Sequence, residues 1–239
     1  MKTQSFPRIL ALILLAPPLA MAEDIRLNFL ETPDRTSAFT LEDLKNTGTV
    51  TGSKNQIVCI DEVGPVCIIA IGDAENPSVS GRVRKGFLLF RLPSMEGKKL
   101  AKATLHLFLA QIKNEADGKP LPPASLFHAG EWNDEAWTGD PRFKGLELSH
   151  FSEGGIFNEQ VPLCTSENTP GKIITIDVTD MVRKDYGRSG EPVAVFRMEV
   201  AEHEKLDIAD QKPNLYVFWG PNFTPPKPDR VPTLVLSFE

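Results

Sequence analysis

The side chains best suited to holding a charged ligand are concentrated in residues 82–110. This segment sets a group of basic residues against a single acid, Glu96: Arg82, Arg84, Lys85, Arg91, Lys98, Lys99 and Lys102. Arginine offers a planar, bidentate fork to carboxylates, and an aromatic ring offers an apolar surface for stacking. We therefore take Arg84, Arg91, Lys102, His106 and Phe108 as candidate ligand-binding residues. One alternative is that these cations only keep strand edges soluble. Another is that Phe87, Leu89 and Phe108 are covered by the N-terminal segment or a second layer, which would leave no groove.

No recognisable catalytic or metal-binding motif accompanies this segment. The four histidines (His106, His128, His150 and His203) are scattered, and neither H-E-x-x-H nor G-x-S-x-G occurs. The neighbouring acids Asp134, Glu135 and Asp140 lack the alternating oxygen ligands and fixed glycine of a calcium loop. We therefore predict no catalytic residues, no metal and no cofactor, and a structural calcium stays an alternative that no motif supports. Paired carboxylates keep a polysaccharide-cleaving enzyme as an alternative.

In the oxidising compartment expected for an exported chain, three cysteines predict one disulfide and one remaining thiol. Cys59 and Cys67 bracket residues 60–66, where Gly64 and Pro65 predict a turn between two short strands. A cross-link between these two strands is the preferred pairing, with Cys164 as the buried, unpaired thiol. The competing pairing joins Cys164 to one of the other two cysteines, and the spacing does not choose between them.

The first 22 residues have the pattern of a cleaved export signal. Lys2 and Arg8 precede a short apolar run, and Ala20, Met21 and Ala22 form an A-x-A cleavage site. The apolar run is shorter than the roughly 20 residues that span a bilayer, so we predict no integral membrane segment. The expected location is secreted or periplasmic. Without this leader the chain keeps 24 basic and 32 acidic residues, a net charge of −8, which disfavours nucleic acid as a partner.

Strands with one buried face must position the candidate residues. Ala103, Leu105, Leu107 and Leu109 alternate with more polar neighbours, which is the period of a strand packed on a core. With this strand, placed at 101–110, short strands are predicted near 57–61, 65–71, 86–92, 125–129, 172–177, 192–200, 214–219 and 232–238. Glycine and proline separate them, which favours an all-β jelly-roll sandwich over residues 57–239. Residues 23–56 are predicted as an N-terminal extension, and residues 111–124 and 142–171 as irregular loops.

One short helix is expected at residues 179–186, directly after a strand. Thr179 is a favourable N-cap, and Asp180 lies in the first turn, where the helix dipole favours an acid. Val178 and Val182 are four residues apart and can both face the sandwich. We predict that this helix caps one end of the core.

Four phrases in order resemble one family of secreted β domains. They are residues 88–92 followed by 101–110, residues 132–137 with Pro141, residues 176–182, and the closing strand 232–238. Together they resemble the DNRLRE-type domains, which are related to family 96 carbohydrate-binding modules and disaggregatase-related proteins. The resemblance implies a secreted jelly-roll sandwich that binds polysaccharides, including acidic ones such as alginate. Leu89 and Arg91 depart from the family pattern, which has a basic residue and an acid at these positions.

These observations together predict a secreted, non-catalytic carbohydrate-binding module, with an acidic extracellular polysaccharide as the first candidate ligand. The first alternative is a structural or adhesive cell-surface protein that binds a protein partner. The second is a small polysaccharide lyase or hydrolase, to which paired carboxylates or a histidine–tyrosine pair would supply the acid and base.

Overall fold

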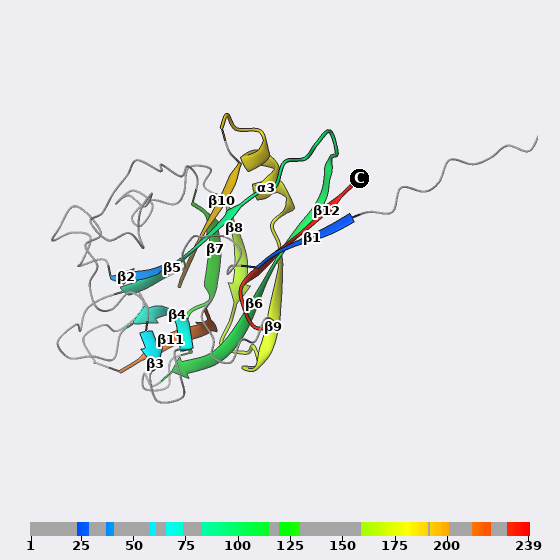
Figure 1. Ribbon diagram of the computed structural model, residues 1–239. Helices are drawn as coiled ribbons and strands as arrows, with labels where there is room; N and C mark the ends of the chain where they lie inside the picture. Colours follow the sequence, from blue (N-terminus) through cyan, green and yellow to red (C-terminus); the bar gives the residue numbers. More distant parts are fainter. Residues whose placement is uncertain are drawn as a thin grey trace, which may run out of the picture.

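Two layers of antiparallel strands face each other in the computed structural model, with a short helix at one end (Figure 1). The structure describes residues 23–28, 37–40, 58–60, 66–73, 83–114, 120–129, 159–190, 192–200, 212–220 and 229–239. These residues form an all-β sandwich, as the strand pattern predicts.

The elements in chain order are β1 (Glu23–Asn28), β2 (Ser37–Thr40), β3 (Val58–Ile60), β4 (Val66–Asp73), β5 (Val83–Arg91), β6 (Leu100–Asn114), β7 (Ala124–His128), β8 (Gln160–Cys164), β9 (Lys172–Asp177), α3 (Thr179–Tyr186), β10 (Val193–Val200), β11 (Asn214–Trp219) and β12 (Thr233–Phe238). The strand order across the sheet is β1-β12-β6-β11-β4-β5-β10-β7-β8. In addition, β2 pairs with β5, β3 with β4 and β9 with β6.

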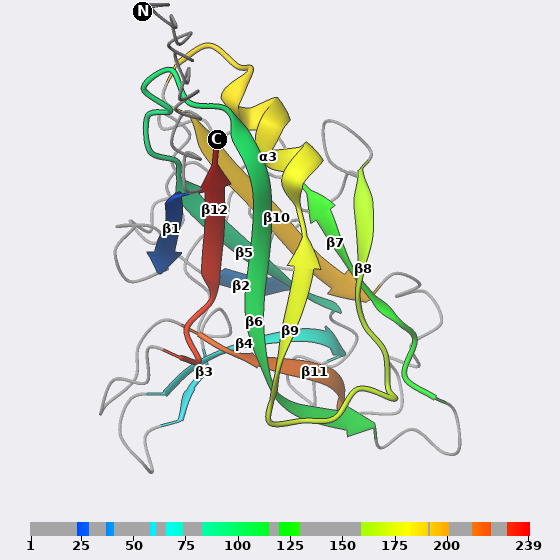
Figure 2. The same ribbon diagram turned by 90° about the vertical axis from the view of Figure 1, so that its right-hand side faces the viewer.

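The long strand β6 joins the two layers. Its first residues pair with β12 on one side and its middle with β9 on the other, which together with β1 make the front layer. Its last residues pair with β11, which continues through β4 into β5 and β10 of the back layer. Figure 2 shows the front layer facing the viewer, with β5 and β10 behind it.

The core lies between these layers and confirms the alternation predicted for β6. Ala103, Leu105, Leu107 and Leu109 are completely buried. From the back layer, Leu88 and Phe90 of β5 and alternate residues of β10 belong to the same apolar cluster. Because side chains alternate along a strand, the intervening residues of β6 must point away from the core.

The N-terminal segment is part of the sheet, so the predicted boundary at residue 57 does not separate it from the sandwich. β1 pairs along its whole length with β12, from Glu23 opposite Phe238 to Asn28 opposite Thr233. β2 pairs with β5. The polar composition of this segment hides these strands, because among the described strands β1 pairs with β12 alone and β2 with β5 alone.

Two predicted loops were also partly wrong. β6 continues to Asn114, into the segment expected to be irregular from residue 111, because β11 pairs with it as far as Asn114. β8 falls within the expected loop 142–171 and pairs with β7. Pro162 interrupts the strand pattern of β8, and proline is tolerated there because this strand ends the sheet order.

The helix occupies the predicted residues, but its predicted N-cap was wrong. Thr179 is already the first helical residue and Val178 is the cap, without a capping side chain. The Thr179 hydroxyl is instead committed to Asp177 and to the backbone of Ala103 in β6. Val178 and Val182 are both buried, which confirms that the helix packs against the sandwich.

Candidate ligand-binding face

The front layer presents one continuous side to solvent, which we call the outer face. Register places alternate residues of four strands on it in rows. Its described members are Asp24 and Arg26 of β1, Thr233, Val235 and Ser237 of β12, Lys102, Thr104, His106 and Phe108 of β6, and Ile173, Thr175 and Asp177 of β9. Thr233, opposite His106, is buried, and the other described members are exposed or half-buried. β1 therefore extends this layer at its edge and leaves most of the described face open.

Charged groups of both signs gather at the upper end of the outer face. Lys102 is exposed and lies beside Ser237, whose hydroxyl donates to Asp24 at 2.5 Å. Asp177 lies beside Thr104 on the next row. Hydrogen bonds from Thr179 hold the pKa of Asp177 below its usual range, aided by the nearby cations Lys102 and Arg183. This end therefore offers hydrogen-bonded acceptors next to an exposed donor.

His106 lies in the middle of the outer face. It is half-buried, and its Nε2 lies 3.4 Å from the hydroxyl of Thr104. Burial lowers the pKa of His106, and the positive charge of Arg26 lowers it further. The neutral imidazole, with one donor and one acceptor, is therefore the favoured form near pH 7.

The lower end of the outer face is aromatic. Phe108 meets Trp219 edge to face, with ring centroids 5.8 Å apart. The guanidinium of Arg230 lies over both rings, at 4.7 Å from Phe108 and 5.0 Å from Trp219. Ile173 sits beside Phe108 and is half exposed. The sequence analysis did not identify Arg230 or Trp219, because the loop before β12 carries no periodic signal and Trp219 lies on a different strand.

The predicted ligand-binding residues divide between the two layers. Lys102, His106 and Phe108 share the outer face. Arg91 is on β5 in the back layer, opposite Val193, and is half-buried. The backbone of Arg84 pairs with Thr40 and Gly72 in the same layer, while its side chain lies outside the described set. The structure therefore brings three of the five residues together.

The corresponding side of the back layer is covered, and we call its charged group the buried triad: Lys85, Arg197 and Glu199. Lys85 forms an ion pair with Glu199, and Arg197 donates to the same carboxylate at 3.2 Å. Arg197 also lies 4.8 Å above the ring of Phe127. Burial lowers the pKa of both cations, and Glu199 opposes the shift. This group is enclosed and offers no described surface to a ligand.

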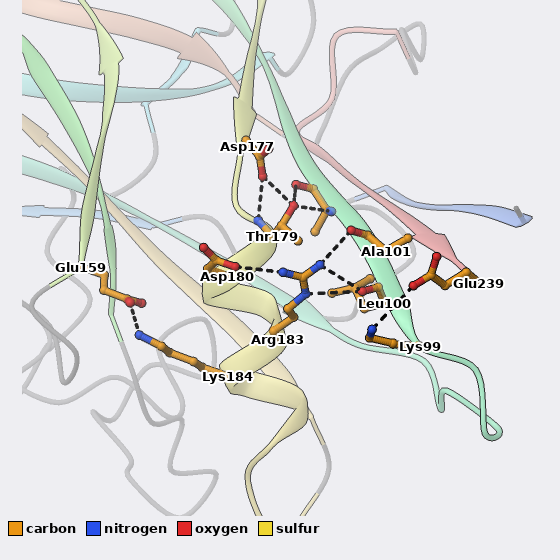
Figure 3. A network of polar contacts seen from close by, with 11 residues as sticks. Lys99, Leu100, Ala101, Glu159, Asp177, Thr179, Asp180, Arg183, Lys184 and Glu239 are labelled. Carbon is orange, nitrogen blue, oxygen red and sulfur yellow. Dashed lines mark hydrogen bonds and ion pairs between the residues drawn. The ribbon is translucent and has the colours of Figure 1, made fainter.

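A pocket of about 690 Å³ adjoins the upper end of the outer face. Its walls come from the start of β6, the end of β9 with the first turns of α3, and the start of β8. Figure 3 shows how α3 is tied to β6 beside this pocket. Arg183 donates to the carboxylate of Asp180 and to the carbonyl oxygen of Ala101, both at 3.1 Å. The wall formed by α3 is thus fixed to the sheet.

A buried polar cluster lies between α3 and β7. His128 is completely buried, and its Nε2 lies 2.8 Å from Oδ1 of the equally buried Asp185. Glu159 approaches Nδ1 of His128 at 3.5 Å and pairs with Lys184. Burial raises the pKa of Asp185, and His128 opposes this shift; the bond from Lys184 lowers the pKa of Glu159. The cluster joins the helix to the back layer. His128 and Asp185 are enclosed, whereas Glu159 is half-buried and lines the pocket beside α3.

The cysteines are placed consistently with the preferred pairing, which stays a prediction. The backbones of Cys59 and Cys67 lie directly opposite each other in β3 and β4, while their side chains lie outside the described set. Cys164 is a free, buried thiol, as predicted. Burial raises its pKa to about 12.

Several predicted features lie outside the described residues: the leader 1–22, Trp132, Trp137, the acids Asp134, Glu135 and Asp140, and two histidines, His150 and His203. Across the described part of the chain, no three acidic, histidine or cysteine side chains are grouped as a metal site. In the same residues, no helix has the length and apolar character needed to cross a membrane.

No protein-family model matches this chain, and the search of curated proteins found no relative. The resemblance to DNRLRE-type domains therefore stays a prediction.

Proposed function

We propose that this chain is an exported, non-catalytic module that binds an extracellular polysaccharide through the outer face. The observation that carries the proposal is the open side of the front layer, which presents charged, hydrogen-bonding and aromatic groups in register. Lys102, His106 and Phe108 of β6 lie in one line on it. In contrast, the cations of the buried triad face a carboxylate and are enclosed.

The groups on this face match the two kinds of surface on a sugar. Hydroxyl groups need paired donors and acceptors, which Arg26, Lys102 and Asp177 supply. The C–H faces of a sugar need an apolar platform, which Phe108 and the exposed Ile173 supply. An acidic polysaccharide is the first candidate, because Lys102, Arg26 and Arg230 all reach this layer and a cation pairs with a sugar carboxylate.

Affinity electrophoresis tests the proposal. The chain is run through native gels that contain alginate, polygalacturonate or the neutral glucan laminarin, and we expect retardation in at least one acidic polymer. Lys102→Ala and Phe108→Ala should weaken the retardation about tenfold, the size expected for one charged or aromatic contact. Arg91→Ala removes a cation from the back layer and is the matched control that should leave retardation unchanged.

Unchanged mobility in all the gels would overturn the proposal. Retardation that survives Lys102→Ala and Phe108→Ala would place the ligand elsewhere on the chain. Release of reducing ends or unsaturated uronates from the same polymers would reveal an enzyme instead of a binding module. Capture of a cell-envelope protein without any polysaccharide binding would favour an adhesive role.

Export and a disulfide between Cys59 and Cys67 belong to the same proposal. The direct backbone pairing of these residues supports the cross-link, because it brings the two Cα atoms within the range a disulfide spans. Thiol titration of the unfolded, unreduced mature protein should detect Cys164 alone, and reduction should raise the count to all three cysteines. A full count before reduction would exclude the disulfide.

A further inference from the structure

Arg230 is held at the lower end of the outer face by aromatic rings and not by a carboxylate. Its guanidinium lies 4.7 Å from the centroid of Phe108 and 5.0 Å from that of Trp219. Its Nε lies 3.9 Å from Oδ2 of Asp229, which is beyond hydrogen-bond distance, and the side chain of Asp229 is 73% exposed. Water screens such an exposed pair, so it contributes little. The rings therefore position this cation without a close ion pair to a described residue.

The hydrogen-bonding capacity of Arg230 is also unused within the described part of the chain. No described group accepts a hydrogen bond from its guanidinium, and the side chain is 32% exposed. Arg183 and Arg197 differ, because each donates to a carboxylate, at 3.1 Å and 3.2 Å respectively. A guanidinium that contacts rings uses its flat face, so its N–H edge stays available for an acceptor. Arg230 is thus a pre-positioned cation, whereas the other two arginines are committed to the fold.

An apolar surface lies beside this cation, and the acids of the outer face lie elsewhere. Ile173 is opposite Phe108 in the pairing of β9 with β6, and it is 50% exposed, the one large hydrophobic side chain so exposed among the described residues. Asp24 and Asp177 belong to the upper end of the face, beside Ser237 and Thr104. The lower end therefore combines an apolar patch with a cation, which suits a sugar ring that carries a carboxylate.

We propose that Arg230 recognises the carboxylate of a uronic-acid unit, with the C–H side of that sugar resting on Ile173. This inference rests on the proposed function and deepens it, because it names polyuronates as the ligand class and the residue that distinguishes them from neutral glycans. The planar guanidinium offers two parallel donors that match the two oxygens of a carboxylate. The rings hold it in place before the ligand arrives, which lowers the ordering cost of binding. An esterified uronate keeps the same ring but loses the charge, so it should bind less tightly.

Esterification of one polymer gives the sharpest test, because the sugar ring stays the same. Affinity electrophoresis compares polygalacturonate with its methyl ester and alginate with its propylene glycol ester, each relative to mobility without polymer. We expect the wild type to bind the free acid about tenfold more tightly than the ester. Arg230→Ala should remove most of this difference, the loss expected for a hydrogen bond between charged groups. Arg91→Ala removes a half-buried arginine from the back layer and is the matched control that should keep the wild-type ratio.

Arg230→Lys separates recognition of the carboxylate from net charge and from stability. Lysine keeps a cation beside the rings but lacks the paired, planar donors, so it should recover only part of the affinity lost in Arg230→Ala. Urea denaturation checks that each variant is folded under the assay conditions. An acid-to-ester ratio in both Arg230 variants equal to that of the wild type would overturn the inference and leave polysaccharide binding intact. Wild-type protein that binds ester and acid equally would also overturn it, whereas no retardation of the wild type in any gel would instead reject the proposed function.

Discussion

The two outward sides of this sandwich carry similar side chains in opposite surroundings. On the front layer, Lys102 and His106 belong to an open surface. On the back layer, Lys85 of β5 and Arg197 of β10 lie on the side that faces away from the core, and both are almost fully buried. Cations on a strand therefore do not by themselves mark a ligand surface. What distinguishes the two sides is the burial of these charged side chains.

Burial changes what a charged side chain can interact with. A buried cation must keep a partner, and Glu199 serves both Lys85 and Arg197, so their interaction energy is used within the fold. An exposed cation gains little from such a pair because water screens it. Of these two sets of charged groups, the exposed cations of the front layer can therefore turn toward a ligand without the loss of stability that breaking the buried triad would cause. The predictions below probe this difference.

The largest effect is expected from Glu199→Gln. Removing this carboxylate leaves two buried cations without their shared counter-charge, which should lower the free energy of unfolding by about 3–5 kcal/mol. Urea denaturation followed by circular dichroism measures the change. Lys102→Ala on the outer face is the exposed comparison and should change stability by less than about 0.5 kcal/mol. Similar losses in the two variants would remove the distinction between the layers.

A smaller effect is expected where the front layer does bury part of a cation. Arg230→Ala removes the contact of the guanidinium with Phe108 and Trp219 and should lower stability by about 1 kcal/mol. Arg26→Ala deletes the same charge from an exposed position on β1. If both variants unfold at the same urea concentration, the aromatic contacts add nothing to the charge effect.

The smallest effect concerns the acid response of the front layer. The hydrogen bonds from Thr179 lower the pKa of Asp177, so its stabilisation is complete above the ordinary aspartate pKa of about 3.9 and is lost as pH falls toward the folded value. Asp177→Asn keeps an acceptor oxygen but cannot titrate. Between pH 6 and pH 3 the free energy of unfolding should fall by a few tenths of a kcal/mol less in this variant than in the wild type. The difference is small because the group is exposed and water screens its interactions. Urea denaturation at several pH values measures the change, and an equal fall in the free energy of unfolding of the two proteins would contradict the prediction.

The strands with a buried face were predictable because their periodicity is local. The period of two in residues 101–110 located β6, and residues 172–177 and 214–219 were predicted with the bounds that the structure has. β1, β2 and β8 were missed, since each relies on pairing with a distant strand more than on its own apolar pattern. Thr179 shows the same limit at one residue: its type favours a cap, but Ala103 and Asp177 occupy its hydroxyl.

The candidate site was predictable only along one strand. Lys102, His106 and Phe108 follow from the alternation of β6, because their neighbours are buried. Arg91 was grouped with them because it is near in sequence, yet the chain passes from β5 to β6 by changing layers. Trp219 and Arg230 join Phe108 from the last part of the chain, and no local pattern announces that contact.

The amino-acid sequence by itself determined the class of fold and which side of β6 faces the core, because both follow from alternation within a few residues. Tertiary structure decided which cations are exposed. It enclosed Lys85 and Arg197 against Glu199 and left Lys102 open, and it bonded α3 to the first residues of β6. The physical reason is that burial depends on which distant segments pack together, and local periodicity carries no information about them.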